Sequence, residues 1–410
     1  MTGTKETEQS AIWQYVPINE FALPVDTVTE TVKEGIAGFW RKLRPNPQES
    51  IDTPEMPRDR LESLSDRELS RLVAEPVWRD ACRALSHCVM PWFDNERETN
   101  VMLTVTGPPY SGTAETLELF AKEQGWRVVE TPSAEQIFSG DMAWLEFFKN
   151  GSKPWVLPRL DKCYFRHIHG LNLVRTLSSE LQNQRVSPGI IGCGSWARSY
   201  LRYAAPGLIR NTYVAQALDH DKMSLWLQSL AFANNQPAVL FREQDNGALI
   251  FPENSEEKSD CLFMRHLAAY CRGNAGVGRA VWRHSLCDEP QQAKIREIAA
   301  AVNEDDHTFD RKHRTVWVLP WQCLQHPATD ANIDDHQRML MHALLLHDGL
   351  SIDLLLALLP ISRFAIIEAL QRLEQIDLVT LQNGEWRIGA TGYPEARRIL
   401  KDAGFLIDDF

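Results

Sequence analysis

Between residues 101 and 195 the sequence alternates short apolar segments with longer amphipathic stretches. The apolar segments cover 101–106, 127–130, 155–160 and 189–192, and helices are predicted over 113–124, 141–150 and 164–184. Strands that alternate with helices of this length pair in parallel and connect through right-handed crossovers. Few polar residues interrupt the apolar segments, so both faces of the sheet are expected to be covered. The sequence therefore predicts an α/β fold on a parallel sheet, followed by helix over 196–235.

A glycine-containing loop follows the first predicted strand. Gly107 and Gly112 have the spacing of G-x-x-x-x-G-K-[ST], which places backbone N–H groups around a phosphate at the start of a helix. Thr113 stands where that motif has lysine, and Ala114 stands where it has serine or threonine. The cation for the β- and γ-phosphates and the hydroxyl for Mg²⁺ are therefore both missing. The loop is predicted either to hold phosphate through its backbone or to be a tight turn without a ligand.

The third predicted strand continues into Pro158-Arg159-Leu160-Asp161. This segment resembles the Walker B segment of STAND-type ATPases, in which an apolar strand is followed by Asp-Asp-Leu-Asp-Arg-Cys. The two leading acids fall on Pro158 and Arg159, and neither side chain can ligate a metal or orient a water molecule. Asp161 remains, either as the Walker B acid of a shifted register or as the N-cap of the following helix.

Two later segments extend the resemblance to P-loop ATPases of the AAA+/STAND type. Ser195 follows the fourth strand, where that family has a polar residue that senses the γ-phosphate, although it could equally cap the next helix. Residues 267–282 are similar to the helical lid of the family. Gly276 stands where the AAA+ lid has its sensor arginine, and Arg272 and Arg279 are the candidate substitutes.

The resemblance implies a P-loop NTPase-like sheet with a helical lid and a family history of nucleotide binding. ATP or ADP is the candidate ligand, and the alternative is that no cofactor binds. No catalytic residue and no metal site is predicted, so the chain is expected not to be an enzyme. The candidate nucleotide-contacting residues are Gly107, Gly112, Thr113, Ala114, Asp161, Ser195 and Arg279.

The C-terminal region is predicted to be a winged-helix domain. Its helices are expected over 335–347, 351–358 and 362–376, followed by a hairpin over 378–388. The third helix carries only two cations, Arg363 and Arg372, and the chain has a formal net charge of −12. DNA-binding surfaces need several phosphate-facing cations. A protein contact is therefore predicted for this domain, and nucleic acid is disfavoured.

Four regions follow from these patterns. They are an N-terminal arm (1–60), a P-loop NTPase-like domain (61–235), a hairpin insertion with the helical lid (236–330) and the winged-helix domain (331–410). The eight cysteines form no C-x-x-C pair and the N-terminus has no secretory pattern, which together predict reduced thiols and a cytoplasmic location.

The predicted function is that of a non-catalytic AAA+/STAND-like scaffold or regulatory protein, a pseudo-ATPase that acts through protein–protein interaction. The expected partner is a protein, within a homo- or hetero-oligomer or a membrane-associated complex. Two alternatives stay open. One is a nucleotide-binding switch with weak or no hydrolysis, and the other is a winged-helix DNA-binding regulator.

Overall fold

The computed structural model describes residues 12–24, 61–94, 101–149, 153–232, 239–251, 261–289, 314–324 and 332–410. These residues form two compact units, each assembled from separate stretches of chain. The first unit draws on 1–22, 77–217 and 326–410, and the second draws on 23–76 and 218–325. Most of the predicted N-terminal arm, 1–11 and 25–60, lies outside the described residues.

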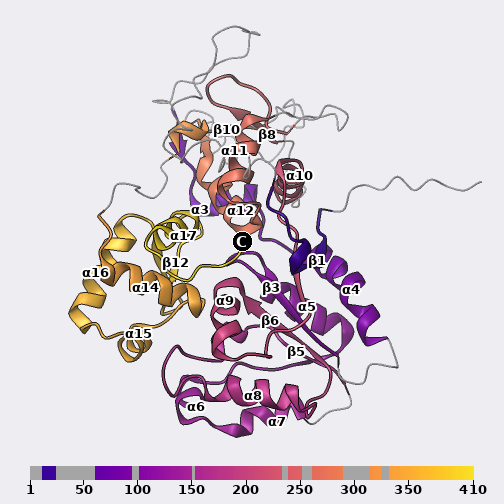
Figure 1. Ribbon diagram of the computed structural model, residues 1–410. Helices are drawn as coiled ribbons and strands as arrows, with labels where there is room; N and C mark the ends of the chain where they lie inside the picture. The colour runs from indigo at the N-terminus through magenta and orange to yellow at the C-terminus, as the bar shows by residue number, and fades with distance from the viewer. Residues whose placement is uncertain are drawn as a thin grey trace, which may run out of the picture. The chain divides into compact units, whose positions relative to one another are not determined.

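A six-stranded sheet forms the centre of the first unit (Figure 1). Its strand order is β1-β7-β3-β6-β5-β4, and every pair is parallel except the antiparallel pair of β1 with β7. The α/β fold class with a mostly parallel sheet is therefore confirmed. The strands are β1 (Tyr15–Pro17), β3 (Met102–Gly107), β4 (Arg127–Val128), β5 (Trp155–Leu157), β6 (Gly189–Gly194) and β7 (Thr212–Ala215).

The helix predicted over 196–235 is wrong in its middle part. Helix α9 (Ser195–Ala204) ends before Pro206, and β7 then pairs with β3 before helix α10 (His220–Ala231) begins. Gly207 has φ 87° and Asn211 has φ 40°, so the backbone leaves helical geometry between the two helices. The short segment β7 is stabilised as a strand by its pairing with β3, which local sequence periodicity does not reveal.

Helices α4 (Arg79–Phe93) and α5 (Thr113–Gln124) bury their apolar sides against the sheet. Leu85 and Val89 of α4 join Leu117 and Phe120 of α5 in one cluster. This cluster also contains Leu103, Val105, Val156 and Ile190 from the strands. The remaining helices of this region are α6 (Ala134–Ser139), α7 (Glu146–Lys149) and α8 (Asn172–Gln182). Burial of these side chains fixes the strand β3 that leads into the glycine-containing loop.

Residues 332–410, which we call the C-terminal module, belong to the same unit as the six-stranded sheet. Three helices and a two-stranded hairpin follow in the order that the sequence predicted, and a closing helix comes after them. They are α14 (Asp335–Leu346), α15 (Ile352–Leu358), α16 (Arg363–Gln375), β11 (Val379–Gln382), β12 (Glu385–Ile388) and α17 (Tyr393–Asp402). The N-cap side chains Asp334, Ser351 and Ser362 each accept a backbone hydrogen bond and so define where the first three helices begin.

The second unit contains a four-stranded sheet in the order β2-β9-β10-β8. Its strands are β2 (Glu62–Ser63), β8 (Val239–Glu243), β9 (Leu286–Asp288) and β10 (Arg314–Val318), and its helices are α3 (Asp66–Leu72), α10, α11 (Leu262–Tyr270) and α12 (Ala275–Ser285). Between α11 and α12 the chain turns at Gly273, which has φ 73°, and Asn274 caps α12. Among the described residues, no helix combines the length and the apolar character that crossing a bilayer requires.

Candidate functional site

The loop between β3 and α5 turns sharply at two residues with positive φ. Tyr110 has φ 70°, and Gly112, the N-cap residue of α5, has φ 75°. The N-terminus of α5 has no side-chain cap. Its first-turn N–H groups therefore point toward the loop, which is the arrangement that favours an anion.

Neighbouring side chains lie close to both glycines of the loop. A Cβ on Gly107 would collide with the hydroxyls of Ser111 and Thr113, which lie 2.9 Å from each other. A Cβ on Gly112 would collide with the indole ring of Trp78. The loop is thus packed on one side by an aromatic ring and lined near Gly107 by two neutral hydroxyls, where the P-loop motif has a lysine.

Asp161 is held at the carboxyl ends of the parallel strands β5 and β6. It lies in the 3₁₀ turn Leu160–Lys162, and its carboxylate accepts a hydrogen bond from the N–H of Gly194 at 3.3 Å. Burial, and then the nearby charge of Asp348, raise the pKa of Asp161 above its ordinary value. Asp161 does not cap the following helix, because that helix, α8, begins only at Asn172 and Leu171 holds its N-cap position.

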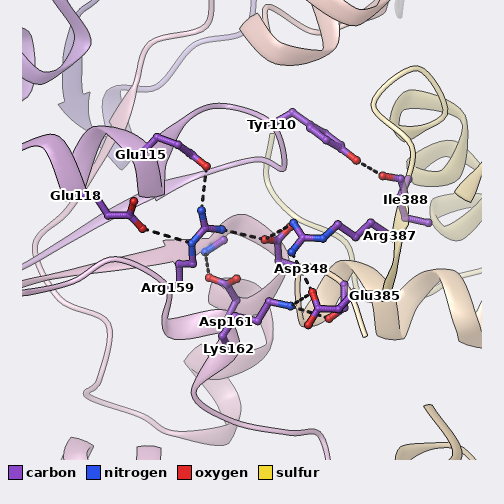
Figure 2. A network of polar contacts seen from close by, with 12 residues as sticks. Tyr110, Glu115, Glu118, Arg159, Asp161, Lys162, Asp348, Glu385, Arg387 and Ile388 are labelled. Carbon is purple, nitrogen blue, oxygen red and sulfur yellow. Dashed lines mark hydrogen bonds and ion pairs between the residues drawn. The ribbon is translucent and has the colours of Figure 1, made fainter. Parts of the chain in front are cut away.

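Arg159 connects helix α5 with the C-terminal module (Figure 2). Its guanidinium lies 2.9 Å from Glu115 and 3.7 Å from Glu118, both on α5, and 3.3 Å from Asp348. Asp348 follows α14 in a turn where it has φ 47°. One cation at the end of β5 therefore pairs with carboxylates from two separate parts of the unit.

A second set of ion pairs surrounds the β11–β12 hairpin. Lys162 lies 2.9 Å from a carboxylate oxygen of Glu385 and donates a hydrogen bond of 2.9 Å to the carbonyl of Gly349. Arg387 lies 3.0 Å from Glu385 and 3.3 Å from Asp348. Figure 2 shows that these groups form one continuous network with Arg159.

Tyr110 links the loop itself to the same hairpin. Its hydroxyl donates a hydrogen bond to the carbonyl of Ile388, the last residue of β12 (Figure 2). Tyr110 has a positive φ, so the turn of the loop sets the direction in which its side chain points. The loop and the C-terminal module are therefore joined by a direct contact as well as through Arg159.

A cavity of about 540 Å³ lies among the loop, the ends of β5 and β6, and the C-terminal module. This volume is in the range of small-molecule pockets in proteins. Its charged lining consists of the cations Arg159, Lys162 and Arg387 and the acids Glu115, Asp161, Asp348 and Glu385. The loop residues Gly107, Gly112, Thr113 and Ala114 and the later Ser195 also line it. The structure thus brings six of the seven sequence-predicted residues to one cavity.

The hydroxyl of Ser195 forms a hydrogen bond with a residue that the sequence did not predict as its partner. Its hydroxyl donates a hydrogen bond of 2.5 Å to Asp408, which also accepts from Tyr393 at 3.0 Å and from Arg397 at 2.8 Å. Ser195 is the first residue of α9, and Gly194 holds the N-cap position. The hydroxyl therefore contacts the C-terminal module and does not cap the helix.

Arg279 lies on α12 in the second unit. Its guanidinium pairs with Glu75 at 2.6 Å and donates hydrogen bonds to the carbonyls of Ala74 at 3.2 Å and Val73 at 3.5 Å. These contacts anchor the segment before α4 to the helix that the sequence identified as part of a lid. Arg279 is not among the residues that line the cavity.

Several residues of the site were missed by sequence reasoning. Tyr110, Asp348, Glu385 and Arg387 all contribute to the network around the cavity. The only local signal is the Asp348-Gly349 pair, a combination that favours a turn with positive φ, as observed. That signal predicts a turn and carries no information about which surface the turn faces.

Comparison with solved structures finds similar proteins, each at low sequence identity and a low TM-score. The chain is similar to the RuvB Holliday junction branch migration motor of Thermotoga maritima, with 12% identity over 80% of this chain and 95% of that chain and a TM-score of 0.33. It is also similar to Cdc6p of Pyrobaculum aerophilum, with 12% identity, 83% and 99% coverage and a TM-score of 0.30. The ORC1 protein of Aeropyrum pernix, solved in complex with DNA, matches with 12% identity, 82% and 97% coverage and a TM-score of 0.33.

Similarity at this level concerns the fold and not the function. No protein-family model matches the chain, and no curated protein matches its sequence significantly.

The prediction that the chain is not an enzyme is contradicted by this comparison. The matched structures include a Holliday junction branch migration motor. The residues at Thr113, Ala114, Pro158 and Arg159 depart from the P-loop and Walker B patterns.

Proposed function

We propose that this chain is a regulatory protein of the AAA+/STAND type that binds ATP or ADP beside the loop at 107–113. In this proposal the C-terminal module senses whether the site is filled. One observation supports it above the others. Arg159 lines the cavity and pairs at the same time with Glu115 of α5 and with Asp348 of the module. A ligand that changes the ion pairs of Arg159 therefore affects both helix α5 and the C-terminal module.

The phosphate side of the site favours weak binding. Backbone N–H groups at the start of α5 attract an anion, but Thr113 and Ala114 supply neither the cation nor the metal-binding hydroxyl of a P-loop. A site of this kind holds nucleotide loosely enough to exchange it readily. Ready exchange of nucleotide is the behaviour expected of a nucleotide-dependent switch.

We further propose that the C-terminal module is a winged helix that contacts a protein partner. On α16, Arg363 pairs with Asp353 at 3.5 Å and Arg372 pairs with Glu368 at 2.7 Å. Cations that are already paired with carboxylates contribute little positive potential to attract a nucleic-acid backbone.

Calorimetric titration with ATP and with ADP tests the nucleotide proposal. Thr113→Lys restores the missing cation and is expected to tighten binding about tenfold, while Thr113→Glu places an anion at the same position and is expected to abolish it. The two variants are matched, because they change one residue on the surface of the loop. If both bind nucleotide like the wild type, the ligand does not sit at this loop and the proposal is wrong.

The rate of phosphate release, measured in the same samples, gives the rate at which the protein hydrolyses ATP. A mobility-shift titration at several salt concentrations tests the partner class. Tight, salt-dependent binding to duplex DNA would contradict the proposed protein contact.

A further inference from the structure

The residues around the loop do not fit a magnesium site. Mg²⁺ requires several oxygen ligands in near-octahedral geometry. Ala114 and Pro158 supply no side-chain oxygen, and Arg159 places a positive charge next to the loop. Within the parts of the chain that the structure describes, no group of three or more His, Cys, Asp and Glu side chains is arranged to hold a metal ion.

The same cavity is rich in cations that the P-loop motif does not specify. Arg159, Lys162 and Arg387 all line it, and their side chains are only 30%, 19% and 30% exposed. Partial burial strengthens the interaction of such groups with an anion, because less solvent screens their charge. Three positive charges therefore lie near a loop that lacks its own lysine, together with the carboxylates of Glu115, Asp161, Asp348 and Glu385, which line the same cavity.

These cations are paired with carboxylates. Arg159 lies 2.9 Å from Glu115, and Glu385 lies 3.0 Å from Arg387 and 2.9 Å from Lys162. Asp348 lies 3.3 Å from the guanidinium of Arg159 and 3.3 Å from that of Arg387. A guanidinium binds carboxylate and phosphate with the same planar, two-pronged geometry. A phosphate that entered the cavity would therefore compete with Asp348 for both guanidiniums.

We infer that the cavity binds a nucleoside di- or triphosphate without a divalent metal, and that Arg159 and Arg387 exchange Asp348 for the phosphates. This inference rests on the proposed function. The two arginines take over the charge neutralisation that Mg²⁺ and the P-loop lysine provide elsewhere. Because Asp348 belongs to the C-terminal module, the exchange also releases one anchor of that module.

The deciding experiment compares nucleotide affinity with and without metal. ATP and ADP are titrated into the full chain in a Mg²⁺ buffer and in an EDTA buffer, and the two dissociation constants are expected to agree within about threefold. Arg159→Gln and Arg387→Gln are each expected to weaken binding about tenfold or more, since each removes a charge-assisted contact. Arg363→Gln is the control, because Arg363 lies outside the cavity and is 63% exposed.

A variant that gains affinity provides a further test, because misfolding cannot increase binding. Asp348→Asn removes the competing charge while keeping the shape of the side chain, so it is expected to tighten binding about fivefold or more. Arg159→Lys keeps the charge without the planar fork and is expected to fall between Arg159→Gln and the wild type. Thermal unfolding of each variant verifies that it is folded.

The possible failures are distinguishable. Binding that requires Mg²⁺ would overturn this inference and leave the proposed nucleotide function intact. An Asp348→Asn variant that binds no better than the wild type would overturn the exchange. Absence of binding in both buffers would overturn the inference and the proposed function together.

Discussion

The hydroxyl of Ser195 and the carboxylate of Asp408 are joined by a hydrogen bond of 2.5 Å, although the two residues lie far apart in the sequence. The Asp408 side chain is fully buried and also pairs with Arg397 at 2.8 Å. Asp409 continues the contact through an ion pair with Arg198 at 2.9 Å. The segment after α17 is therefore tied to the start of α9, at the edge of the cavity.

Asp408→Asn is expected to destabilise the protein strongly. The substitution leaves the guanidinium of Arg397 buried without its counter-charge, which costs about 3–5 kcal/mol in comparable cases. Asp402→Asn is the control, because Asp402 is 61% exposed and its pair with Arg398 contributes about 1 kcal/mol or less. Urea denaturation of both variants measures the difference. Similar midpoints for the two would show that Asp408 is not an anchor.

Gly112→Ala is expected to cost more stability than Gly384→Ala. Both glycines have positive φ, 75° and 82°, so both variants incur the left-handed strain of about 1–2 kcal/mol. Only at Gly112 would the new Cβ collide with Trp78, which adds about 1–3 kcal/mol, whereas nothing lies within 4 Å at Gly384.

The collision can be isolated in a double-mutant cycle. In a Trp78→Ala background, Gly112→Ala is expected to cost only as much as Gly384→Ala, measured by equilibrium unfolding. A cost for Gly112→Ala that is unaffected by the loss of Trp78 would contradict the packing of the indole on the loop.

Acid is expected to destabilise the protein through His347. Burial, and then the charge of Lys162, lower the pKa of His347 to about 3 from an ordinary value near 6.5. The unfolded chain therefore binds more protons than the folded chain between these values, so stability falls as the pH decreases below 6.5. The contribution is at most about 1.4 kcal/mol for each pH unit in that window.

His347→Gln is expected to reduce this slope, and His169→Gln, at an exposed position, to leave it unchanged. Asp161 titrates in the opposite sense, because its raised pKa makes the folded state bind protons more tightly. The informative quantity is thus the difference between variant and wild type, measured by denaturation from pH 7.5 to 4.5. Equal slopes would rule out His347 as the source.

Tyr110→Phe is expected to loosen the contact between the loop and β12. It removes only the hydroxyl that donates to the carbonyl of Ile388, at a cost of about 1 kcal/mol. Amide hydrogen exchange at residues 107–112 and 385–389 should accelerate by about fivefold, since local opening follows the free energy of the contact. Tyr203→Phe, at a side chain 75% exposed, is the control. Unchanged exchange at both segments would contradict the link.

The parts of the fold that depend on local pattern were predictable from the sequence. The buried strands β3, β5 and β6 carry no charged residue, and α14, α15 and α16 of the C-terminal module start at the recognisable N-cap residues Asp334, Ser351 and Ser362. The spacing of Gly107 and Gly112 likewise identified the loop, because close packing leaves no room for side chains there. In each case the physical constraint lies within a few neighbouring residues.

The electrostatic part of the site could not be predicted in the same way. Arg159 and Asp348 are adjacent only because the C-terminal module packs against the end of β5. Ser195 was predicted to sense phosphate or to cap a helix, and its partner Asp408 comes from a segment without regular secondary structure. Strand β1 was missed because its three residues gain their extended conformation from pairing with β7.

The order of these elements along the chain bears on how the protein is made. All six strands of the central sheet precede residue 216, whereas Asp348 and Glu385 follow much later. Chains fold progressively as they leave the ribosome, starting from the N-terminus. The loop and its strands can therefore be completed while Lys162 lacks Glu385 and Arg159 has only Glu115 and Glu118 as partners, so the nascent protein passes through an open state before the module closes the cavity.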